Sequence, residues 1–299
     1  MVMDMTIDTW QHEYPFRNNF LEINGNKYHY LDEGNPEGEV VIMLHGNPTW
    51  SFYYRNIVKE LQEDYRCIVP DHFGCGLSDK PQDYEYTLEN HINNVLMLID
   101  QLQIKKFKLL VHDWGGAIGM GVATSRPESV TGVILLNTAA FKSLDIPKRI
   151  ALCKLPLIGE PMVRTFNAFA WPATFMTTTK PLAKHIKEGY LHPYNSYKNR
   201  IATARFVKDI PLTKSHPSYG RLEEIENGLK NVKCPKMFLW GAKDFCFNMK
   251  FLKRWKEFYP QEDSKTKYVV YENAGHYVIE DERENCLKEI KGFLNEYSS

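Results

Sequence analysis

Short runs of apolar and β-branched residues alternate with longer stretches of helical periodicity along most of this chain of 299 residues. The apolar runs lie at 40–44, 66–70, 108–112, 132–137, 236–240 and 268–271. Strands that alternate with helices form a mainly parallel sheet, and helices cover both faces of such a sheet. The sequence therefore predicts an α/β fold.

The stretches with helical periodicity lie at 51–61, 87–102, 115–125, 248–259 and 281–297. Ahead of the first apolar run, the segment FLEINGNKYHYLDEG places Asn24 and Gly25 between two stretches of alternating residues. Asn-Gly is a preferred pair for the two-residue turn that joins antiparallel strands. We therefore expect an antiparallel hairpin at one edge of the sheet.

The alternation stops between 141 and 215, where the chain is rich in proline, aromatic and helix-compatible residues and shows no strand pattern. This stretch begins directly after a predicted strand, and open α/β sheets bind ligands at that edge. We predict a helical cap at 141–215, between two parts of one core at 1–140 and 216–299. The alternative is a set of packing helices without a role in substrate binding.

The overall charge does not favour a polyanionic partner. Thirty-seven Lys and Arg residues balance thirty-seven Asp and Glu residues, so no net field attracts nucleic acid or an anionic membrane. The N-terminal segment MVMDMTIDTWQHEYPF has no basic stretch followed by an apolar run, and no segment has about 18 uninterrupted apolar residues. We therefore expect a cytoplasmic protein without a transmembrane segment.

Six cysteines are scattered along the chain without a C-x-x-C pair or a metal-ligand spacing. They are Cys67, Cys75, Cys153, Cys234, Cys246 and Cys286. Most lie in apolar surroundings, so we expect buried, reduced thiols. No ligand cluster and no phosphate-binding glycine loop is visible in the sequence, which predicts neither a metal nor an organic cofactor.

The segment KLLVHDWGG, at 108–116, holds the candidate nucleophile. An apolar strand is followed by Asp113 and then by Gly115 and Gly116, which open a helix. This is the layout of a nucleophile elbow, a tight strand-to-helix turn whose small neighbours let the helix approach. Asp113 stands at the position of the nucleophile. Its alternative role is to cap the helix, since aspartate is a favoured N-cap residue.

Asn47 and Trp114 are the candidate hydrogen-bond donors. Asn47 lies in HGNPTW after the strand at 40–44, and a loop at that strand end can face the elbow. The backbone amides of both residues would form an oxyanion hole, while the Asn47 side chain and the Trp114 indole N–H would hold a departing anion. The alternative for Trp114 is a core aromatic. His45 is expected to brace the loop.

His276 and Asp244 are the candidate base and acid. His276 lies in ENAGHYVIED after the last predicted strand, and Asp244 lies in LWGAKDFCF after the strand before it. The order Asp113, Asp244, His276 matches the chain order nucleophile, acid, base. Asn137 lies at a competing position for the acid but does not ionise. The alternative for His276 and Asp244 is that of ordinary loop residues.

A carboxylate nucleophile is ionised near neutral pH, so it needs no base for its own activation. His276 would instead deprotonate a water that attacks the ester formed between Asp113 and a carbon atom of the substrate. Displacement at saturated carbon followed by hydrolysis suits a small hydrophobic substrate. Asp71 and His72, within PDHFGCGLSDKP, are expected to belong to a structural turn.

In HGNPTW, HDWGG, the post-strand Asp244 and GHYVIED, the sequence resembles the haloalkane dehalogenase family of α/β-hydrolases, with the motifs in the same order. The resemblance implies an eight-stranded, mostly parallel sheet with helices on both faces and a helical cap. It implies Asp113 as nucleophile, His276 as base and Asp244 as acid. Asn47 and Trp114 would be the halide-stabilising pair, a set similar to that of the third subfamily.

The segments PDHFGCGLSDKP, FNAFA and NRIATARFVKDIPL are more narrowly similar to bacterial β-lactone decarboxylases, sister enzymes of that subfamily in olefin biosynthesis. This similarity implies that Asp113 opens a four-membered lactone and that the products are a cis-alkene and carbon dioxide. It also implies partners among the enzymes of hydrocarbon biosynthesis. We favour the decarboxylase, because these segments are more specific than the shared site residues.

Four other functions stay open at this point. A haloalkane dehalogenase would convert a haloalkane and water to an alcohol and halide. An epoxide hydrolase would activate the ring oxygen with tyrosines of the cap, for which Tyr190, Tyr194 and Tyr197 are candidates. A coelenterazine-type luciferase is a more distant enzymatic alternative. A binding protein without catalysis would often lack one member of the catalytic set, whereas every member is present here.

Overall fold

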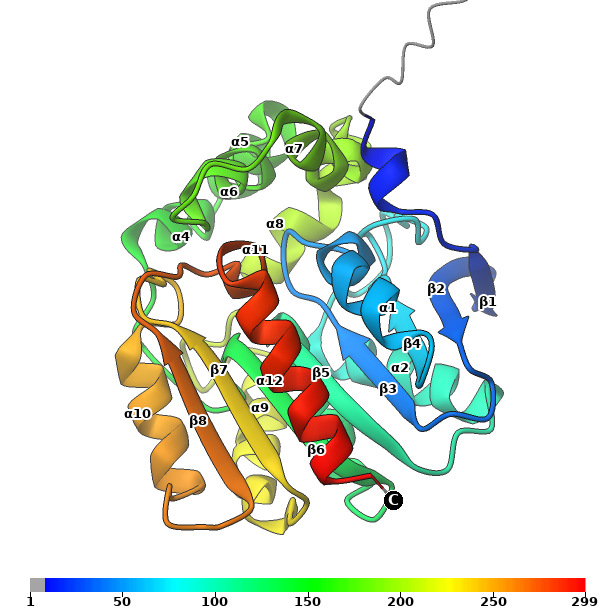
Figure 1. Cartoon of the computed structure of the whole chain (residues 1–299). Coiled ribbons are helices and arrows are strands. Elements are labelled where there is room, and N and C mark those ends of the chain that lie inside the picture. Colours follow the sequence, from blue (N-terminus) through cyan, green and yellow to red (C-terminus); the bar gives the residue numbers. More distant parts are fainter. Residues whose placement is uncertain (1–8, 299) are drawn as a thin grey trace, which may run out of the picture.

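The computed structural model describes residues 9–298 and contains an eight-stranded sheet with helices on both faces (Figure 1). In order across the sheet, the strands are β1 (Asn19–Ile23), β2 (Asn26–Gly34), β4 (Arg66–Pro70), β3 (Val40–Leu44), β5 (Phe107–Asp113), β6 (Val130–Thr138), β7 (Lys236–Gly241) and β8 (Thr266–Tyr271). Every apolar run predicted as a strand is a strand, and β3 and β4 have the predicted ends. The predicted fold class is confirmed.

The antiparallel edge of the sheet is the predicted hairpin. β1 pairs with β2 and β2 pairs with β4 in antiparallel orientation, whereas the other neighbouring strands are parallel. Asn24 and Gly25, at the turn between β1 and β2, have φ values of 51° and 76°. Both values lie in the left-handed region that a tight hairpin turn requires and that Asn and Gly tolerate best.

Successive side chains of the central strands enter two hydrophobic cores on opposite faces of the sheet. In β3, Ile42 and Leu44 belong to one core, and Val41 and Met43 belong to the other. This follows from the two-residue period of a strand. The first core includes residues of α2 (Leu88–Gln101), α3 (Trp114–Ser125), α9 (Tyr219–Gly228) and α10 (Met249–Phe258), and the second includes residues of α1 (Arg55–Leu61), α11 (Val278–Asp281) and α12 (Arg283–Glu296).

Two helical predictions are wrong in detail. The stretch 51–61 begins with a 3-10 turn, η2 (Ser51–Tyr54), before α1. The Ser51 amide donates to the Asp71 carboxylate at 2.7 Å, so a neighbouring loop determines the start of this segment. The last stretch is interrupted at Glu282, whose φ of −128° and ψ of 43° are not helical. Local periodicity detects neither interruption, because both sites satisfy tertiary contacts.

The chain between β6 and α9 is helical and lies over the end of the sheet where the parallel strands terminate (Figure 1). Its helices are α4 (Lys148–Cys153), α5 (Gly159–Phe166), α6 (Ala170–Met176), α7 (Lys184–Leu191), η3 (His192–Tyr194), η4 (Lys198–Arg200) and α8 (Ile201–Lys208). We call residues 141–215 the helical cap. The domain boundaries at 140 and 215 stay a prediction.

Two short 3-10 helices complete the description of the elements. η1 (Trp10–Glu13) precedes the sheet, and η5 (Leu229–Asn231) follows α9. All six cysteines are free thiols, four of them buried, while Cys234 and Cys246 are partly buried. Within residues 9–298, no helix combines the length and the apolar character that crossing a bilayer requires.

Candidate active site

The strand-to-helix turn at Asp113 has the geometry of an elbow. Asp113 is the last residue of β5, and its φ of 52° lies in the left-handed region. Its neighbours must be small. A Cβ atom on Gly115 would lie 1.9 Å from the carbonyl oxygen of Leu44, and one on Gly46 would lie 2.1 Å from Oδ1 of Asp113. The paired glycines therefore permit the close approach of α3 that the motif predicts.

Asp113 stands at the N-cap position of α3, but its side chain makes no capping hydrogen bond. Its Oδ1 atom accepts a hydrogen bond from the Asn47 backbone amide at 2.7 Å, and the Trp114 backbone amide also donates to the carboxylate. These are the two amides predicted for an oxyanion hole. In this arrangement the Asn47 amide holds Oδ1 of the candidate nucleophile. The other oxygen, Oδ2, lies 3.6 Å from Nε2 of His276.

His276 and Asp244 face each other behind Asp113. Nδ1 of His276 lies 2.8 Å from Oδ2 of Asp244, and both side chains are buried. The second oxygen of Asp244 accepts from the Cys246 backbone amide at 2.6 Å. The carboxylate thus holds Nδ1 as the protonated nitrogen and leaves Nε2 directed at Asp113. Both side chains therefore lie at the candidate site, and their roles as base and acid stay a prediction.

Burial and charge oppose each other in this cluster. Burial alone would lower the pKa of His276, but the carboxylates of Asp244 and Asp113 outweigh it and raise this pKa above its ordinary value. Burial raises the pKa of Asp113 above its ordinary value, against the effects of His276 and of the two backbone amides. The imidazole is therefore more basic than usual at the atom that faces Asp113.

Two residues that the sequence analysis did not assign to the site hold its framework. Nε2 of His112 lies 2.9 Å from the carbonyl oxygen of His276, and burial lowers the pKa of His112 well below its ordinary value, so it donates as a neutral imidazole. Asn137 accepts from the Gly241 amide at 2.7 Å and donates to the Gly241 carbonyl at 3.1 Å. The position of His112, directly before Asp113 in HDWGG, could have indicated from the sequence that it belongs to the site.

The side chains of Asn47 and Trp114 lie on the same cavity as Asp113. Nδ2 of Asn47 donates to the Thr203 carbonyl of α8 at 3.2 Å, which leaves one of its two hydrogens for another acceptor. Trp114 is half-buried, and its ring packs 5.3 Å from that of Phe206. A purely core position for Trp114 is therefore excluded.

The loop residues predicted to be structural are structural. Nδ1 of His45 lies 2.7 Å from the Gly46 carbonyl oxygen, and its Nε2 accepts from the His72 amide at 3.0 Å. Asp71 is buried and accepts from the amides of Ser51 and Leu77 at 2.7 and 2.8 Å. These contacts brace the loops behind β3 and β4 and bring no further titratable group to Asp113.

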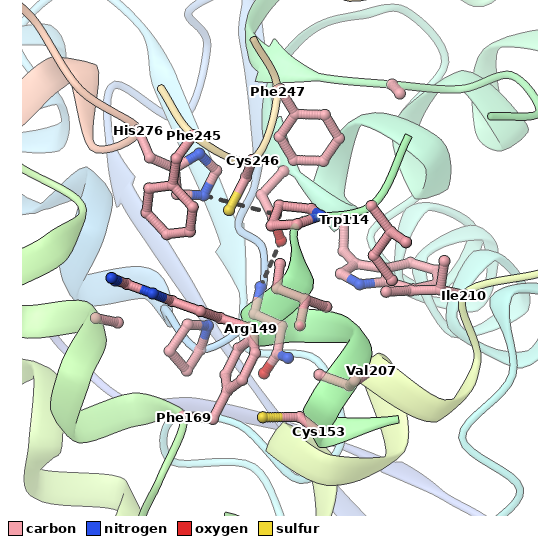
Figure 2. Close-up of a pocket in the computed structure, with 18 of the residues that line it drawn as sticks. Trp114, Arg149, Cys153, Phe169, Val207, Ile210, Phe245, Cys246, Phe247 and His276 are labelled. Atoms are coloured by element: carbon pink, nitrogen blue, oxygen red, sulfur yellow. Dashed lines mark hydrogen bonds and ion pairs between the residues drawn. The ribbon is translucent and has the colours of Figure 1, made fainter. Parts of the chain in front are cut away.

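The cavity in front of Asp113 has a volume of about 420 Å³ and is mainly apolar. In Figure 2, Phe245, Cys246 and Phe247 from the loop after β7 face Phe169 and Cys153 of the helical cap. Further apolar wall residues are Leu88, Ala117, Ile150, Leu152, Met162, Met176, Val207, Ile210, Leu212 and Phe251. A cavity of this size and lining suits a small hydrophobic molecule with one polar end directed at the elbow.

The cap tyrosines do not line this cavity. The Tyr190 hydroxyl donates to Glu280, and the Tyr194 hydroxyl donates to the Thr49 carbonyl at 3.2 Å. Tyr197 is exposed, with its ring against the Arg164 guanidinium. None of these three tyrosines therefore offers its hydroxyl to a ring oxygen at Asp113, which argues against an epoxide hydrolase.

One set of possible metal ligands among residues 9–298 lies at the edge of the site. Ligand atoms of Asp244, Cys246 and His276 all lie within 4.8 Å of one another. Sequence spacing did not reveal this set, because two loops bring it together. Nδ1 of His276 and Oδ2 of Asp244 within this set already share a hydrogen bond at 2.8 Å.

Comparison with known proteins agrees with this geometry. A family model described as alpha/beta hydrolase fold matches residues 39–283. A cis-3-alkyl-4-alkyloxetan-2-one decarboxylase of Shewanella oneidensis is 44% identical over 290 residues, which cover 94% of this chain and 89% of the relative. Haloalkane dehalogenase 2 of Mycobacterium bovis is 30% identical over 275 residues, or 90% of this chain and 91% of the relative.

A solved structure described as a putative ancestral haloalkane dehalogenase is also similar. It superposes with a TM-score of 0.84 at 25% sequence identity, and the match covers 93% of this chain and 99% of that chain. The sheet and the helices around it therefore have the arrangement of that structure along nearly their whole length.

Proposed function

Because the chain belongs to the α/β-hydrolase-fold family, in the group that includes cis-3-alkyl-4-alkyloxetan-2-one decarboxylases and haloalkane dehalogenases, we propose that it is a β-lactone decarboxylase. Its substrate would be a cis-3,4-dialkyl β-lactone and its products a cis-alkene and carbon dioxide. The observation that carries the proposal is the carboxylate of Asp113, which the amides of Asn47 and Trp114 hold at the end of an apolar cavity.

In the first proposed step, Oδ2 of Asp113 attacks the ring carbon C4 from the side opposite the ring oxygen. The strained C4–O bond breaks, and its electron pair leaves on the lactone oxygen as a carboxylate. The result is an alkyl ester of Asp113. The neutral donors of Asn47 and Trp114 lie on the same cavity and would receive this new carboxylate.

In the second proposed step, the C2–C3 bond of the intermediate breaks and carbon dioxide leaves. The bond electrons form the C3–C4 double bond, and the C4–O bond to Asp113 breaks at the same time, which regenerates the carboxylate. Backside attack places the Asp113 oxygen opposite the departing carboxylate, so an anti elimination retains the cis arrangement of the alkyl groups. No water is consumed, and every atom of the lactone appears in the two products.

The raised pKa of His276 favours the protonated form of the imidazole, which this scheme uses. Its protonated imidazole, 3.6 Å from Oδ2 of Asp113, would stabilise the carboxylate that leaves C4 in the second step. Asp244 would keep the ring oriented and charged. In a hydrolytic cycle the same imidazole would instead act as a base toward water, and the product would be an alcohol.

Haloalkane dehalogenase is the second candidate function. It is favoured by the neutral donors Asn47 and Trp114 and by the 30% identity to haloalkane dehalogenase 2. The 44% identity to a decarboxylase over a larger part of the chain favours the lactone as the substrate. We also propose a cytoplasmic enzyme of olefin biosynthesis whose partners supply the lactone by ring closure of a β-hydroxy acid.

The test is incubation of the purified protein with a cis-dialkyl β-lactone and, separately, with a bromoalkane. We expect cis-alkene and carbon dioxide in equal amounts, without formation of the β-hydroxy acid that hydrolysis of the ester would give. Asp113→Asn should lower alkene formation by about 10³-fold or more, because the amide is a poor nucleophile. Halide release by the wild type without any alkene from the lactone would overturn the proposal in favour of the dehalogenase.

A further inference from the structure

We propose that the outer face of the helical cap binds the surface of an anionic phospholipid membrane. Exposed apolar side chains are concentrated there. Among residues 9–298, thirteen large hydrophobic side chains are exposed, and nine of them lie between 141 and 215. The nine are Leu144, Leu152, Leu155, Leu157, Ile158, Phe166, Trp171, Phe175 and Tyr197. Such a concentration in a quarter of the chain marks an interaction surface.

The loop between α4 and α5 is the most apolar part of this face. Leu155, Leu157 and Ile158 are 45, 95 and 58% exposed. Leu157 has a φ of 64°, in the left-handed region that leucine rarely adopts. Exposure of this leucine to water does not offset the cost of the strained backbone, because hydration of apolar surface is unfavourable. Insertion of these side chains among acyl chains would remove their apolar surface from water.

The neighbouring helices add aromatic rings to the loop. Trp171 and Phe175 lie one turn apart on α6, are 56 and 49% exposed, and have ring centroids 4.9 Å apart. Phe166, at the end of α5, is 77% exposed. Aromatic side chains, tryptophan above all, concentrate at the level of the lipid headgroups in membrane-bound proteins. The three rings therefore suit the rim of a surface that inserts into the headgroup region.

Charge complementarity identifies the lipid as anionic. Residues 141–215 hold thirteen Lys and Arg against four Asp and Glu, whereas the rest of the chain holds twenty-four against thirty-three. The net charge of zero thus hides a strongly basic cap on an acidic core. Lys148 and Arg149 are exposed at the start of α4, the helix that precedes the apolar loop. Each basic residue near an anionic bilayer strengthens binding about fivefold.

The combination of lysine and apolar tips favours lipid over a protein partner. Protein–protein interfaces are depleted in lysine, whereas interfacial membrane segments place apolar and aromatic residues beside Lys and Arg. The overall charge balance concealed this asymmetry, because a sum over the chain does not register where the charges lie. The zero net charge led us to expect no attraction to an anionic membrane. We now propose the opposite for the cap.

The same helices form the wall of the cavity in front of Asp113. Ile150, Met162 and Met176 line the cavity from α4, α5 and α6. Leu152 also lines the cavity and is 48% exposed. It therefore belongs both to the cavity wall and to the exposed apolar surface of the cap. A lipid-dissolved substrate would enter between these helices. This entry route rests on the proposed function, whereas the membrane surface itself does not.

The experiment is co-sedimentation of the full chain with vesicles, without substrate. The vesicles contain about 30 mol % phosphatidylglycerol in phosphatidylcholine, or phosphatidylcholine alone. We expect binding to the anionic vesicles at least about tenfold stronger than to the neutral ones, and a marked loss when NaCl is raised from about 0.1 M to about 0.5 M. Absence of binding to the anionic vesicles would overturn the proposal.

The double variant Leu157→Ser with Ile158→Ser should weaken binding at least about tenfold, because two apolar side chains lose their burial in lipid. The matched control is Phe20→Ser with Met97→Ser. These side chains are 49 and 44% exposed and lie on β1 and α2, outside the cap, so binding should not change.

Unchanged binding in the loop variant would contradict the proposal. So would a protein oligomer that dissociates in the loop variant while vesicle binding persists, since the face would then be a protein interface. Turnover of detergent-dispersed lactone is measured in parallel and should be equal in all three proteins. A protein that binds vesicles but never converts the lactone would refute the proposed function and leave the membrane surface standing.

Discussion

At the scale of single residues, the site separates the two oxygens of one carboxylate. Oδ1 of Asp113 is held by the Asn47 backbone amide, while Oδ2 faces a histidine whose pKa is raised. In the proposed reaction, Asp113 must be ionised and His276 protonated. Since the pKa of Asp113 is also raised, kcat/KM for alkene formation should fall at acidic pH as Asp113 gains a proton and at alkaline pH as His276 loses one.

Asp244→Asn tests this assignment. Asp244 raises the pKa of His276, so its neutral replacement should lower that pKa and move the alkaline limb of the kcat/KM profile to lower pH. Asp145→Asn is the control, because Asp145 lies on the outer cavity wall and pairs with Lys250 at 3.3 Å. An alkaline limb that stays in place in Asp244→Asn would show that His276 does not set it.

At the scale of elements, the elbow depends on the distance between α3 and β6. A Cβ atom on Gly116 would lie 1.7 Å from Oγ1 of Thr138, which donates to the Asp113 carbonyl. Gly116→Ala should therefore destabilise the fold by about 1–3 kcal/mol and reduce turnover, because the helix must shift away from the elbow. Urea unfolding and alkene formation measure the two effects.

Gly292→Ala is the matched control for this substitution. Gly292 lies within α12, and a Cβ atom there would meet nothing within 4 Å. The same added methyl group should stabilise that helix by about 1 kcal/mol and leave turnover unchanged, since alanine is the better helix former. Equal stability of the Gly116→Ala protein and the wild type would contradict the steric account of the elbow.

At the scale of the whole molecule, a buried ion pair between two distant parts of the core also receives a hydrogen bond from the helical cap. Arg55 of α1, 2% exposed, donates to both carboxylate oxygens of Glu280 in α11 at 2.6 and 3.1 Å. The Tyr190 hydroxyl of α7 donates to the same carboxylate. Glu280→Gln should destabilise the fold by about 3–5 kcal/mol, because it removes the hydrogen-bonded counterion of the buried Arg55 and leaves only the partly exposed Glu13 carboxylate at 3.9 Å.

The control is Glu60→Gln, which removes one partner of an exposed pair. Glu60 lies 2.9 Å from Lys291, and the two side chains are 51 and 43% exposed. Water screens this pair, so its loss should change the free energy of unfolding by less than about 1 kcal/mol. Urea unfolding of both variants provides the comparison. A similar loss in both would mean that burial does not distinguish the two pairs.

The sequence by itself determined the features that depend on residues close together along the chain. Strand periodicity, the Asn24-Gly25 turn and the Asp113 elbow depend on neighbours along the chain, and they predicted the fold class, the sheet edge and the candidate nucleophile. The positions of Asp244 and His276 were predicted as well, because parallel strands end at one edge of the sheet. Their catalytic roles stay a prediction.

Only the tertiary structure decided how distant segments meet. His112 reaches the carbonyl of a residue 164 positions away, and Tyr190 and Tyr194 of the cap hydrogen-bond to the core instead of lining the cavity. The basic charge and the exposed leucines of one segment become a surface only when its helices pack. Periodicity reports which side of an element is buried, whereas long-range packing selects the partner against which that side is buried.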